Sequence, residues 1–128
     1  MPFVRIEIIK GQSQEYKTTM LQAVHDALVT ALGIPDDDRN QRLIEIDAAN
    51  FEHREIRTDK YCIIELTLFP GRSREMKAAV IAEITRLLGK RLGVPAGDVY
   101  IMINEPPLDN WGLRGVQGSE LGLDYKKD

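Results

Sequence analysis

Hydrophobic and polar residues alternate at the start of the chain. Between residues 3 and 9, Val4, Ile6 and Ile8 are separated by charged side chains. This two-residue period is typical of a strand with one buried face, because successive side chains of a strand point to opposite sides. The pattern therefore predicts a strand over residues 3–9, which ends at Gly11.

A longer run of apolar residues at helical spacing follows this strand. Ser13 precedes the run and can cap a helix N-terminus with its hydroxyl group. Gly33 and Pro35 come directly after it, and both residue types end helices. We therefore predict a helix over residues 13–32. Its inward face consists of Tyr16, Met20, Ala23, Val24, Ala27, Leu28, Ala31 and Leu32.

Three more strands and a second helix are predicted further along. Residues 61–69 give the strongest strand pattern, because they are rich in β-branched and aromatic side chains. Residues 41–46 and 99–103 are shorter runs of the same kind, and residues 73–92 repeat the helical spacing. The chain thus divides into a first β-α-β unit at about 2–46, a polar linker at about 47–60, a second unit at about 61–103 and a glycine-rich tail at 104–128.

The two units repeat one pattern, because matching residues lie sixty positions apart without a gap. An ungapped match over this length indicates a duplicated β-α-β unit. Helical crossovers between parallel strands are right-handed, so both helices are expected on one face of the sheet. The matching pairs are Gly11 and Gly71, Ser13 and Ser73, Glu15 and Glu75, Lys17 and Lys77, Gly33 and Gly93, Pro35 and Pro95, and Asp38 and Asp98.

These units predict a single α/β (α+β) domain over residues 1–128, with a four-stranded mixed sheet and two helices on one face. The other face of the sheet would be bare, although its strands carry apolar residues on both sides in places. Such a face is expected to pack against copies of itself or against the tail. We therefore predict a closed homo-oligomer.

Composition narrows the class of protein and of partner. The chain has 128 residues, of which 43% are hydrophobic and 29% charged, with a net charge of -3, which is ordinary for a soluble globular domain. Charges of both signs are interspersed, so we expect no large positively charged surface that would bind nucleic acid. The first residues do not resemble a signal peptide, and no apolar run approaches the length of a membrane span. We therefore predict a cytoplasmic protein that binds neither nucleic acid nor membrane.

Candidate ligands for a metal or a cofactor are sparse. Cys62 is the single cysteine, and it lies in an apolar run where a thiol behaves as a small hydrophobe. His25 and His53 have no metal-ligand spacing with Cys62 or with any carboxylate. The glycines of the tail do not follow a strand as those of a phosphate-binding loop would. We therefore predict no metal, no cofactor and no nucleotide site.

Pro2 is the candidate centre of the chemistry. It opens the first strand directly after Met1, and it becomes a free secondary amine once Met1 is removed. An α-amino group has an ordinary pKa of about 7.7–8.0, and an apolar pocket beside a cation lowers it. A neutral amine can take a proton from the carbon next to a carbonyl and return it elsewhere. The alternative is structural, since proline also suits the first residue of a strand.

Pro2 at the start of a strand, two fused β-α-β units and the Gly71-Arg72-Ser73 turn together resemble the tautomerase superfamily. The resemblance covers nearly the whole chain. It implies a trimeric, cofactor-independent enzyme whose proline amine acts as a base in tautomerases and as an acid in decarboxylases and dehalogenases. Among fused members, residues 33–39 and the Trp111-Gly112 tail are most similar to malonate semialdehyde decarboxylase and its neighbours.

The resemblance also implies roles for individual residues. Asp38 falls on the functional aspartate of the decarboxylase, and Arg72 falls on one of its two substrate-binding arginines. Pro70 stands at the position of the other arginine, and Arg74 lies nearby in the first turn of the second predicted helix. His25 aligns with a histidine that the dehalogenases use to hold substrate.

The chemistry of these residues supports the resemblance and leaves alternatives open. The fork of Arg72 can hold a carboxylate in two parallel hydrogen bonds beside a helix N-terminus. Arg114, near glycines and a tryptophan, is a second candidate for the substrate or an ordinary surface arginine. Asp38 also suits a solvated turn, and His25 also suits a helix face. The expected apolar walls of the site are Phe3, Phe69, Trp111 and Leu113.

The leading hypothesis is a cofactor-independent tautomerase of a small oxo or enol carboxylic acid, with Pro2 as general acid/base and Arg72 on the carboxylate. Substrates of the phenylenolpyruvate or 2-hydroxymuconate type carry both a carboxylate and a transferable proton. Decarboxylation or hydration of a three-carbon oxo-acid by Asp38 and a protonated Pro2 is an enzymatic alternative. A trimeric binding module without catalysis is a third hypothesis, since a fold does not fix a function.

Overall fold

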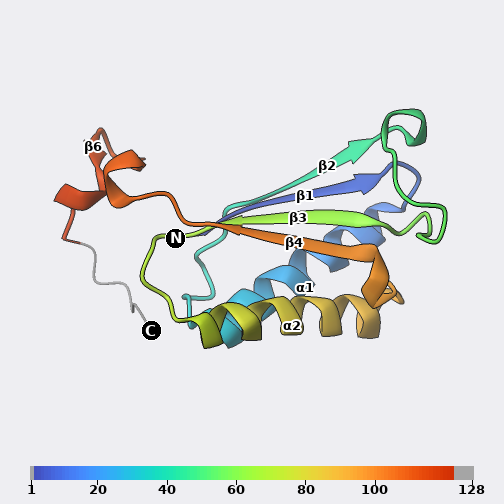
Figure 1. Cartoon of the computed structure of the whole chain (residues 1–128), viewed down its shortest axis with the longest axis horizontal. Helices are drawn as coiled ribbons and strands as arrows, with labels where there is room; N and C mark the ends of the chain where they lie inside the picture. Colours follow the sequence, from blue (N-terminus) through green and yellow to red (C-terminus); the bar gives the residue numbers. More distant parts are fainter. Residues whose placement is uncertain (1, 123–128) are drawn as a thin grey trace.

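The strands of the protein form one layer and its helices form a second (Figure 1). The computed structural model describes residues 2–122, and Met1 and residues 123–128 lie outside this range. The main elements are β1 (Phe3–Ile9), α1 (Gln14–Leu32), β2 (Gln41–Ile46), β3 (Cys62–Thr67), α2 (Arg74–Leu92) and β4 (Val99–Asn104). In the described range these four strands make one sheet in the order β2-β1-β3-β4, and both helices cover the same face of it. The predicted fold class is confirmed.

The predicted ends of these elements hold to within two residues. β3 differs most, because its predicted range of 61–69 shortens to Cys62–Thr67. The amide of Tyr61 donates to the carbonyl oxygen of Thr58 at 3.1 Å, so the chain is still turning there. At the other end, Phe69 has left the sheet and packs against Trp111.

Each helix is closed by the same pair of caps. The hydroxyl oxygens of Ser13 and Ser73 each accept a hydrogen bond of 3.1 Å from an amide of the first turn. Such an N-cap stabilises a helix by about 1 kcal/mol. Gly33 and Gly93 end the helices with φ angles of 70° and 68°, a left-handed conformation that glycine adopts without a steric penalty.

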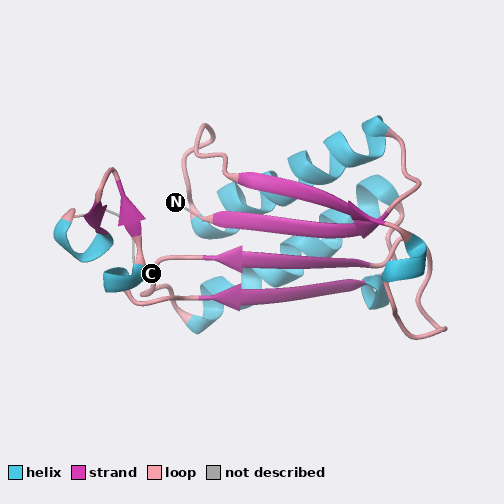
Figure 2. Ribbon diagram, turned by 90° about the horizontal axis from the view of Figure 1, so that it is seen from above, coloured by secondary structure: helices cyan, strands magenta, loops and turns pink. Residues whose placement is uncertain are grey.

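The duplication is visible in the pairing of the strands (Figure 2). β1 runs parallel to β2 and β3 runs parallel to β4, whereas β1 and β3 are antiparallel. Arg5 lies opposite Glu65 in this central pair, so a pseudo-twofold axis that relates residues sixty positions apart passes between them. An ion pair repeats on either side of the axis, as Lys17 with Glu45 at 3.0 Å and Lys77 with Glu105 at 2.6 Å.

The core lies between the sheet and the helices. Ile6, Ile64 and Ile84 are fully buried in it, and burying such a side chain stabilises the fold by roughly 1.5–3 kcal/mol. The alternation predicted for β1 is confirmed, because its even-numbered apolar residues face the helices. Within residues 2–122, no helix combines the length and the hydrophobicity that a membrane crossing requires.

The opposite face of the sheet carries no helix (Figure 2). Tyr100 and Met102 alternate with the core residues of β4 and are 60% and 58% exposed. Arg5 and Glu7 of β1 pair with each other at 3.2 Å. The face of the sheet that was predicted to be bare therefore carries no helix and exposes both apolar and charged side chains.

The connection before β3 is fixed by a buried carboxylate. Asp98 accepts hydrogen bonds from the amide of Thr58 at 3.2 Å and from its hydroxyl group. The Nζ of Lys60 donates to the carbonyl oxygen of Leu92 at 2.9 Å. Asp98 is the counterpart of Asp38 in the repeat, so the second unit uses this aspartate to hold the linker.

Candidate active site

One edge of the sheet gathers segments that are far apart in the sequence (Figure 2). The parallel strands β1 and β2 begin at this edge, and β3 and β4 end at it, because β1 and β3 are antiparallel. The register places Phe3 opposite Thr67, and Thr67 opposite Asn104. The edge is termed the Pro2 edge, and it consists of Pro2, residues 38–42, residues 68–72 and residues 104–111.

Pro2 is buried at the start of β1. The amide of Val4 donates to the carbonyl oxygen of Asn40 at 2.9 Å, which fixes the beginning of β1 beside the segment that leads into β2. Met1 lies outside the described residues, so its removal, which the chemistry of a free amine requires, stays a prediction.

Three aromatic residues from separate segments meet beside Pro2, and they are termed the aromatic wall. Phe3 stacks on Trp111 with ring centroids 5.5 Å apart, and Phe69 lies 4.4 Å from the same indole. Trp111 is buried, and its Nε1 donates to the carbonyl oxygen of Pro106 at 3.1 Å. Phe3, Phe69 and Trp111 were each expected from the sequence as apolar walls, and the structure brings them together.

Arg72 lies on the loop that leaves β3 and is only 7% exposed. Gly71, with a φ angle of 120°, turns the chain directly before it, and the N-cap Ser73 follows it. A guanidinium group is permanently charged, so this loop holds a positive charge at the start of α2, where the helix dipole also favours anions. Arg74, the other arginine expected near the substrate, is exposed in the first turn of α2.

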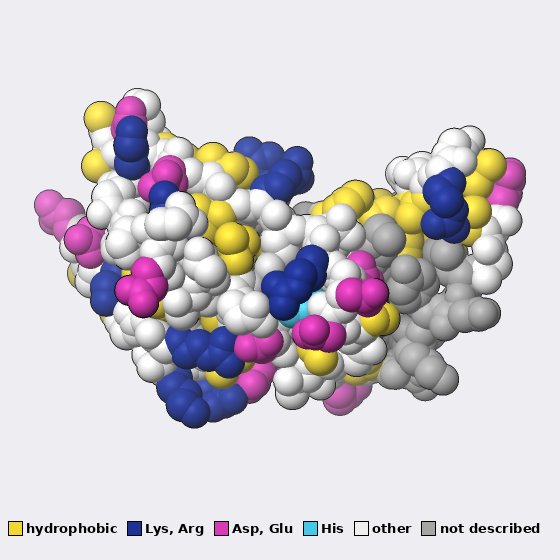
Figure 3. Space-filling model, turned by 180° about the vertical axis from the view of Figure 1, so that it is seen from behind, with side chains coloured by type: hydrophobic (Ala, Val, Ile, Leu, Met, Phe, Trp, Pro, Cys, Tyr) yellow, Lys and Arg dark blue, Asp and Glu magenta, His cyan; other side chains and the backbone are white. Residues whose placement is uncertain are grey.

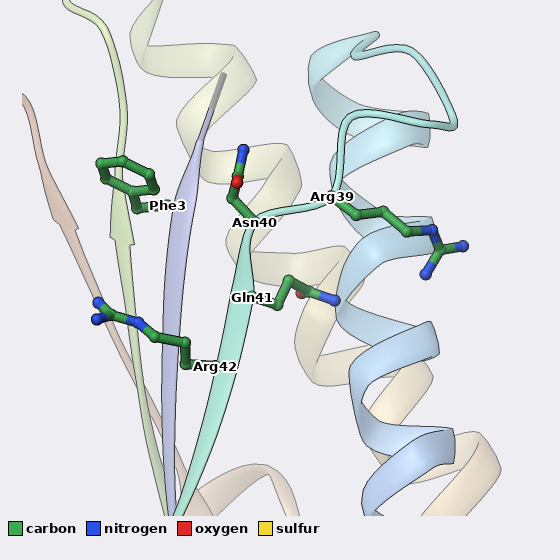
Figure 4. Close-up of a pocket in the computed structure, with 5 residues that line it drawn as sticks. All are labelled: Phe3, Arg39, Asn40, Gln41 and Arg42. Carbon is green, nitrogen blue, oxygen red and sulfur yellow. The ribbon is translucent and has the colours of Figure 1, made fainter. Parts of the chain in front are cut away.

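A pocket of about 410 Å³ opens at the Pro2 edge. Its lining comes from the start of β1 and from the segment that enters β2 (Figure 4). Arg42 lies on the same side of the two strands as the ring of Phe3, whereas Arg39 and Gln41 project toward α1. The residues that line it are Phe3, Arg39, Asn40, Gln41 and Arg42.

Of these five residues, only Phe3 is a candidate that the sequence predicts. The signal for the others was the polar run Arg39-Asn40-Gln41-Arg42 directly before a strand. Such a polar run is typical of an ordinary loop, and its position at the site follows only from the pairing register of β2 with β1. Because β2 pairs in parallel with β1, with Gln41 opposite Val4, the run lies beside Pro2.

The pocket segment is held against α1 by side-chain hydrogen bonds. The guanidinium of Arg39 donates to Gln22 at 3.1 Å, and Gln41 donates to the carbonyl oxygen of Leu21 at 2.8 Å. Gln22 in turn donates to Asp26, which also pairs with Arg91 of α2 at 2.8 Å. Burial acts to raise the pKa of Asp26, but the hydrogen bonds from Arg91 and Gln22 outweigh it and bring the pKa below its ordinary value. Asp26 therefore stays ionised and anchors this chain of contacts.

His25 is fully buried on α1 and does not line the pocket. Its Nε2 lies 2.7 Å from the carbonyl oxygen of Asp36 and 3.4 Å from the carboxylate of the same residue. The imidazole thus fixes the turn that leads to the pocket segment. A direct contact between His25 and a substrate, as the resemblance implies, stays a prediction.

Asp38 is half-buried immediately before the pocket segment. Its amide donates to the carbonyl oxygen of Pro35 at 3.1 Å, and the matching turn of the second unit joins Asp98 to Pro95 at 2.9 Å.

Within the described residues, no three histidine, cysteine, aspartate or glutamate side chains cluster as a metal site requires.

The tail forms a small hairpin that the sequence did not predict. β5 (Gly112–Leu113) and β6 (Val116–Gln117) are each two residues long, and Arg114 lies in the turn between them. Arg114 is exposed, and Leu113 is half-buried. The hairpin follows Trp111 directly, so the aromatic wall forms its base.

Comparison with known proteins decides the family. A family model described as "Tautomerase enzyme" matches residues 38–114, which is more than half of the chain, and a second with the same description matches residues 2–52. The chain belongs to the tautomerase family. It is an enzyme of the tautomerase or isomerase type.

Two relatives illustrate the range of the similarity, because one covers nearly the whole chain and the other covers one unit. "Probable tautomerase YusQ" of Bacillus subtilis (strain 168) is 28% identical over 118 residues, which are 88% of this chain and 93% of that protein. The 2-hydroxymuconate tautomerase of Comamonas testosteroni is 41% identical over 58 residues, which are 45% of this chain and 92% of that protein. A relative that spans little more than one β-α-β unit agrees with the duplication.

Solved structures share the tautomerase fold across nearly the whole chain. FG41 malonate semialdehyde decarboxylase, inhibited by 3-bromopropiolate, has a TM-score of 0.81 at 32% identity and covers 94% of this chain and 98% of its own. A fused 4-OT that forms an asymmetric trimer has a TM-score of 0.86 at 25% identity and covers 94% and 99%.

The repeat places Cys62 where Pro2 stands in the first unit, and the two residues are not equivalent in chemistry. Burial raises the pKa of the Cys62 thiol to about 12, with a smaller contribution from Asp98. The thiol is therefore neutral and inaccessible in the folded protein.

We predict that a disulfide reagent such as DTNB leaves native Cys62 unmodified at pH 8 and labels it within minutes in urea. Rapid labelling of the folded protein would contradict the placement of Cys62 in the core.

Proposed function

We propose that the protein is a cofactor-independent tautomerase of small oxo or enol carboxylic acids, in which the Pro2 amine transfers the proton and Arg72 binds the substrate carboxylate. Pro2, the aromatic wall and arginines from two separate segments converge on one edge of the sheet. The 2-hydroxymuconate tautomerase of Comamonas testosteroni, at 41% identity over one unit, supports the same class of substrate.

Enol-to-keto conversion needs one group that accepts a proton and returns it. The neutral Pro2 nitrogen takes the proton of the enol hydroxyl group, and the electrons of that O–H bond form the carbonyl C=O bond. The electron pair of the C=C bond then takes a proton from the secondary ammonium, which regenerates the neutral amine. One O–H bond breaks and one C–H bond forms, so the reaction needs no co-reactant.

The surroundings of Pro2 favour a neutral amine. Pro2 is buried and followed by Phe3 of the aromatic wall, and burial disfavours the charged form of an amine. The positive charges of nearby arginines act in the same direction. The pKa of the Pro2 amine is therefore expected below its ordinary value of about 7.7–8.0, which makes the amine a base at neutral pH.

Arginines at the Pro2 edge have two tasks in this mechanism. Arg72 holds the carboxylate next to the reacting carbon through its planar fork. Arg42 lies on the same side of the sheet as Phe3 in the pocket, where its charge favours the enolate that forms in the reaction. The pocket of about 410 Å³ lies within the range of small-molecule sites, roughly 300–1,000 Å³.

Decarboxylation or hydration of a three-carbon oxo-acid is the second candidate function. It is favoured by the 32% identity to FG41 malonate semialdehyde decarboxylase and by the half-buried Asp38 beside the pocket. In this reaction Pro2 would act in its protonated form. Pro70, at the position of the second decarboxylase arginine, weighs against it. Release of carbon dioxide from malonate semialdehyde distinguishes the two functions.

We infer that the protein assembles as a homotrimer through the bare face of its sheet. The fused 4-OT at 25% identity is a trimer. Tyr100 and Met102 are exposed on this face, and burying them between copies would be favourable. The cytoplasmic location and the absence of nucleic acid or membrane partners, both expected from the sequence, stay predictions.

Replacing the Pro2 amine tests the proposed function. Pro2→Ala exchanges a secondary amine for a less basic primary amine, and we expect kcat/KM for ketonisation of 2-hydroxymuconate or phenylenolpyruvate to fall about 10²-fold or more, the usual contribution of general acid–base catalysis. The measurement is the loss of enol absorbance. Intact mass must show that Met1 is absent from both proteins, and circular dichroism must show the same fold. An undiminished rate under these conditions contradicts the role of Pro2.

The repeat supplies a matched pair of variants for Arg72. Gln12 occupies the corresponding position of the first unit, so Arg72→Gln introduces the residue that the matching turn of the first unit contains. We expect kcat/KM to fall by about 10²–10³, because a charged bidentate contact to the substrate is lost. Gln12→Ala is the control and should change kcat/KM less than twofold. Equal kinetics for the two variants would remove Arg72 from the site.

A further inference from the structure

Three side-chain hydrogen bonds join α1 to the segment that leads into the pocket, and they are termed the α1 clamp. This segment supplies Arg39, Asn40, Gln41 and Arg42 to the lining of the pocket. The clamp therefore holds one wall of the candidate site against the helical layer. Its contacts are those of His25 with the carbonyl oxygen of Asp36 at 2.7 Å, of Arg39 with Gln22 at 3.1 Å, and of Gln41 with the carbonyl oxygen of Leu21 at 2.8 Å.

The second unit provides an internal comparison, because its matching positions carry three apolar residues and one threonine. The hydroxyl group of this Thr85 donates to the carbonyl oxygen of Ile81 in its own helix at 2.9 Å. The turn after the helix nevertheless closes with the same backbone hydrogen bond in both units. The fold thus forms this turn without a clamp, which indicates that the clamp serves the end of the sheet that carries the site. The matching pairs are Gln22 and Ala82, His25 and Thr85, Arg39 and Val99, and Gln41 and Ile101.

His25 is the fully buried member of the α1 clamp. A carbonyl oxygen only accepts hydrogen bonds, so Nε2 of His25 carries the proton that it donates to Asp36. Nδ1 of His25 is also buried, and within residues 2–122 it has no hydrogen-bond partner. A buried polar atom without a partner is unfavourable, and an apolar side chain of similar size would avoid it. The contact with Asp36 is therefore what distinguishes histidine from an apolar residue at this position.

The backbone connects Asp36 to the start of β1. Three residues separate Asp36 from Asn40, so a displacement of the turn reaches Asn40 directly. The carbonyl oxygen of Asn40 accepts a hydrogen bond of 2.9 Å from the amide of Val4, which lies two residues after Pro2. A shift of the turn would therefore move the pocket wall and the start of β1 together.

The outer surface of the helical layer carries charges of both signs. In the lower half of Figure 3, Lys and Arg side chains lie beside Asp and Glu side chains. Asp26, for example, accepts a hydrogen bond from Gln22 of the clamp and pairs with Arg91 at 2.8 Å. Such a mixture favours neither an anion nor a cation. The polar residues of the clamp are therefore explained by the segment that they hold and not by a ligand on the helical side.

We propose that His25 is a positioning residue of this enzyme. Through the carbonyl oxygen of Asp36, it holds the pocket segment and the start of β1 in the geometry that proton transfer by Pro2 requires. The proposal rests on the proposed function, and it needs no direct contact between His25 and the substrate. Small displacements of reacting groups lower a rate strongly, so the loss of this hydrogen bond is expected to slow the reaction from a distance.

Two amide variants separate the hydrogen bond from the loss of the imidazole ring. The amide nitrogen of His25→Gln can take the place of Nε2 and donate to Asp36, whereas that of His25→Asn ends one atom earlier. We expect kcat/KM for ketonisation of 2-hydroxymuconate to stay within about threefold in His25→Gln and to fall about tenfold or more in His25→Asn. Thr85→Asn introduces the same residue at the matching position of α2 and should leave kcat/KM unchanged. An equal fall for both variants of His25 would overturn the proposal.

Hydrogen exchange at two amides reports the position of the segment without an assay of activity. The amide of Val4 is bonded to Asn40 at the Pro2 edge, and the amide of Lys10 is bonded to Ile46 at the opposite end of the same strand pair, each at 2.9 Å. We expect His25→Asn to speed exchange at Val4 about tenfold relative to Lys10 in NMR spectra, and His25→Gln to preserve the ratio. An unchanged ratio in His25→Asn would overturn the proposal.

The wild-type protein offers a check that depends on no variant of His25. A long-range ¹H–¹⁵N correlation spectrum shows which ring nitrogen of each histidine carries a proton, and His53→Gln assigns the signals of the two histidines. We expect the proton of His25 on Nε2. A proton on Nδ1 alone would exclude the hydrogen bond to Asp36 and overturn the proposal.

The proposed function fails separately. If His25→Asn speeds exchange at Val4 selectively but wild-type protein ketonises no enol acid, the hold of His25 on the segment stands and the tautomerase proposal falls. If wild-type protein ketonises 2-hydroxymuconate and His25→Asn keeps the full kcat/KM, the tautomerase proposal stands and the positioning role of His25 is overturned.

Discussion

The antiparallel pairing of β1 with β3 is the constraint on which the rest of the structure depends. Arg5 and Glu65 face each other at its centre, and each outer strand is parallel to its inner neighbour. This arrangement brings the starts of β1 and β2 and the ends of β3 and β4 to one edge. A slip of one residue in the central pair would turn the core residues outward. The Pro2 edge, the aromatic wall and the pocket all follow from this register.

The two β-α-β units share the residues that form the fold and differ in the residues of the candidate site. The two units share their helix caps, their αL glycines and an ion pair between helix and strand. They differ where the candidate site lies, since Pro2 corresponds to a buried cysteine and Arg72 to Gln12. At the opposite end of the sheet, Asp98 fixes the linker through its hydrogen bond with Thr58. The shared residues maintain the fold, and the residues that differ give one end of the molecule its proposed reactivity.

Much of this fold could be predicted from the sequence because its signals are local. The periods of strand and helix, the Ser13 and Gly33 caps and the sixty-residue repeat gave the element ends to within two residues. Phe3 and Trp111 could be named as walls, but their stacking depends on the tail. The sequence could not predict that residues 39–42 lie at the candidate site, because only the parallel register of β1 and β2 places them beside Pro2. The hairpin was missed because its two-residue strands are too short to show a period.

The proposed chemistry requires that Pro2 carries a free amine that is neutral at physiological pH. The most direct measurement is a ¹⁵N NMR titration of protein labelled with ¹⁵N-proline. The chain has six prolines, and we expect the nitrogen of one to titrate, with a midpoint below the ordinary range of about 7.7–8.0. Six nitrogens that do not titrate, or one that titrates at or above the ordinary range, would rule out a neutral amine on Pro2 at physiological pH.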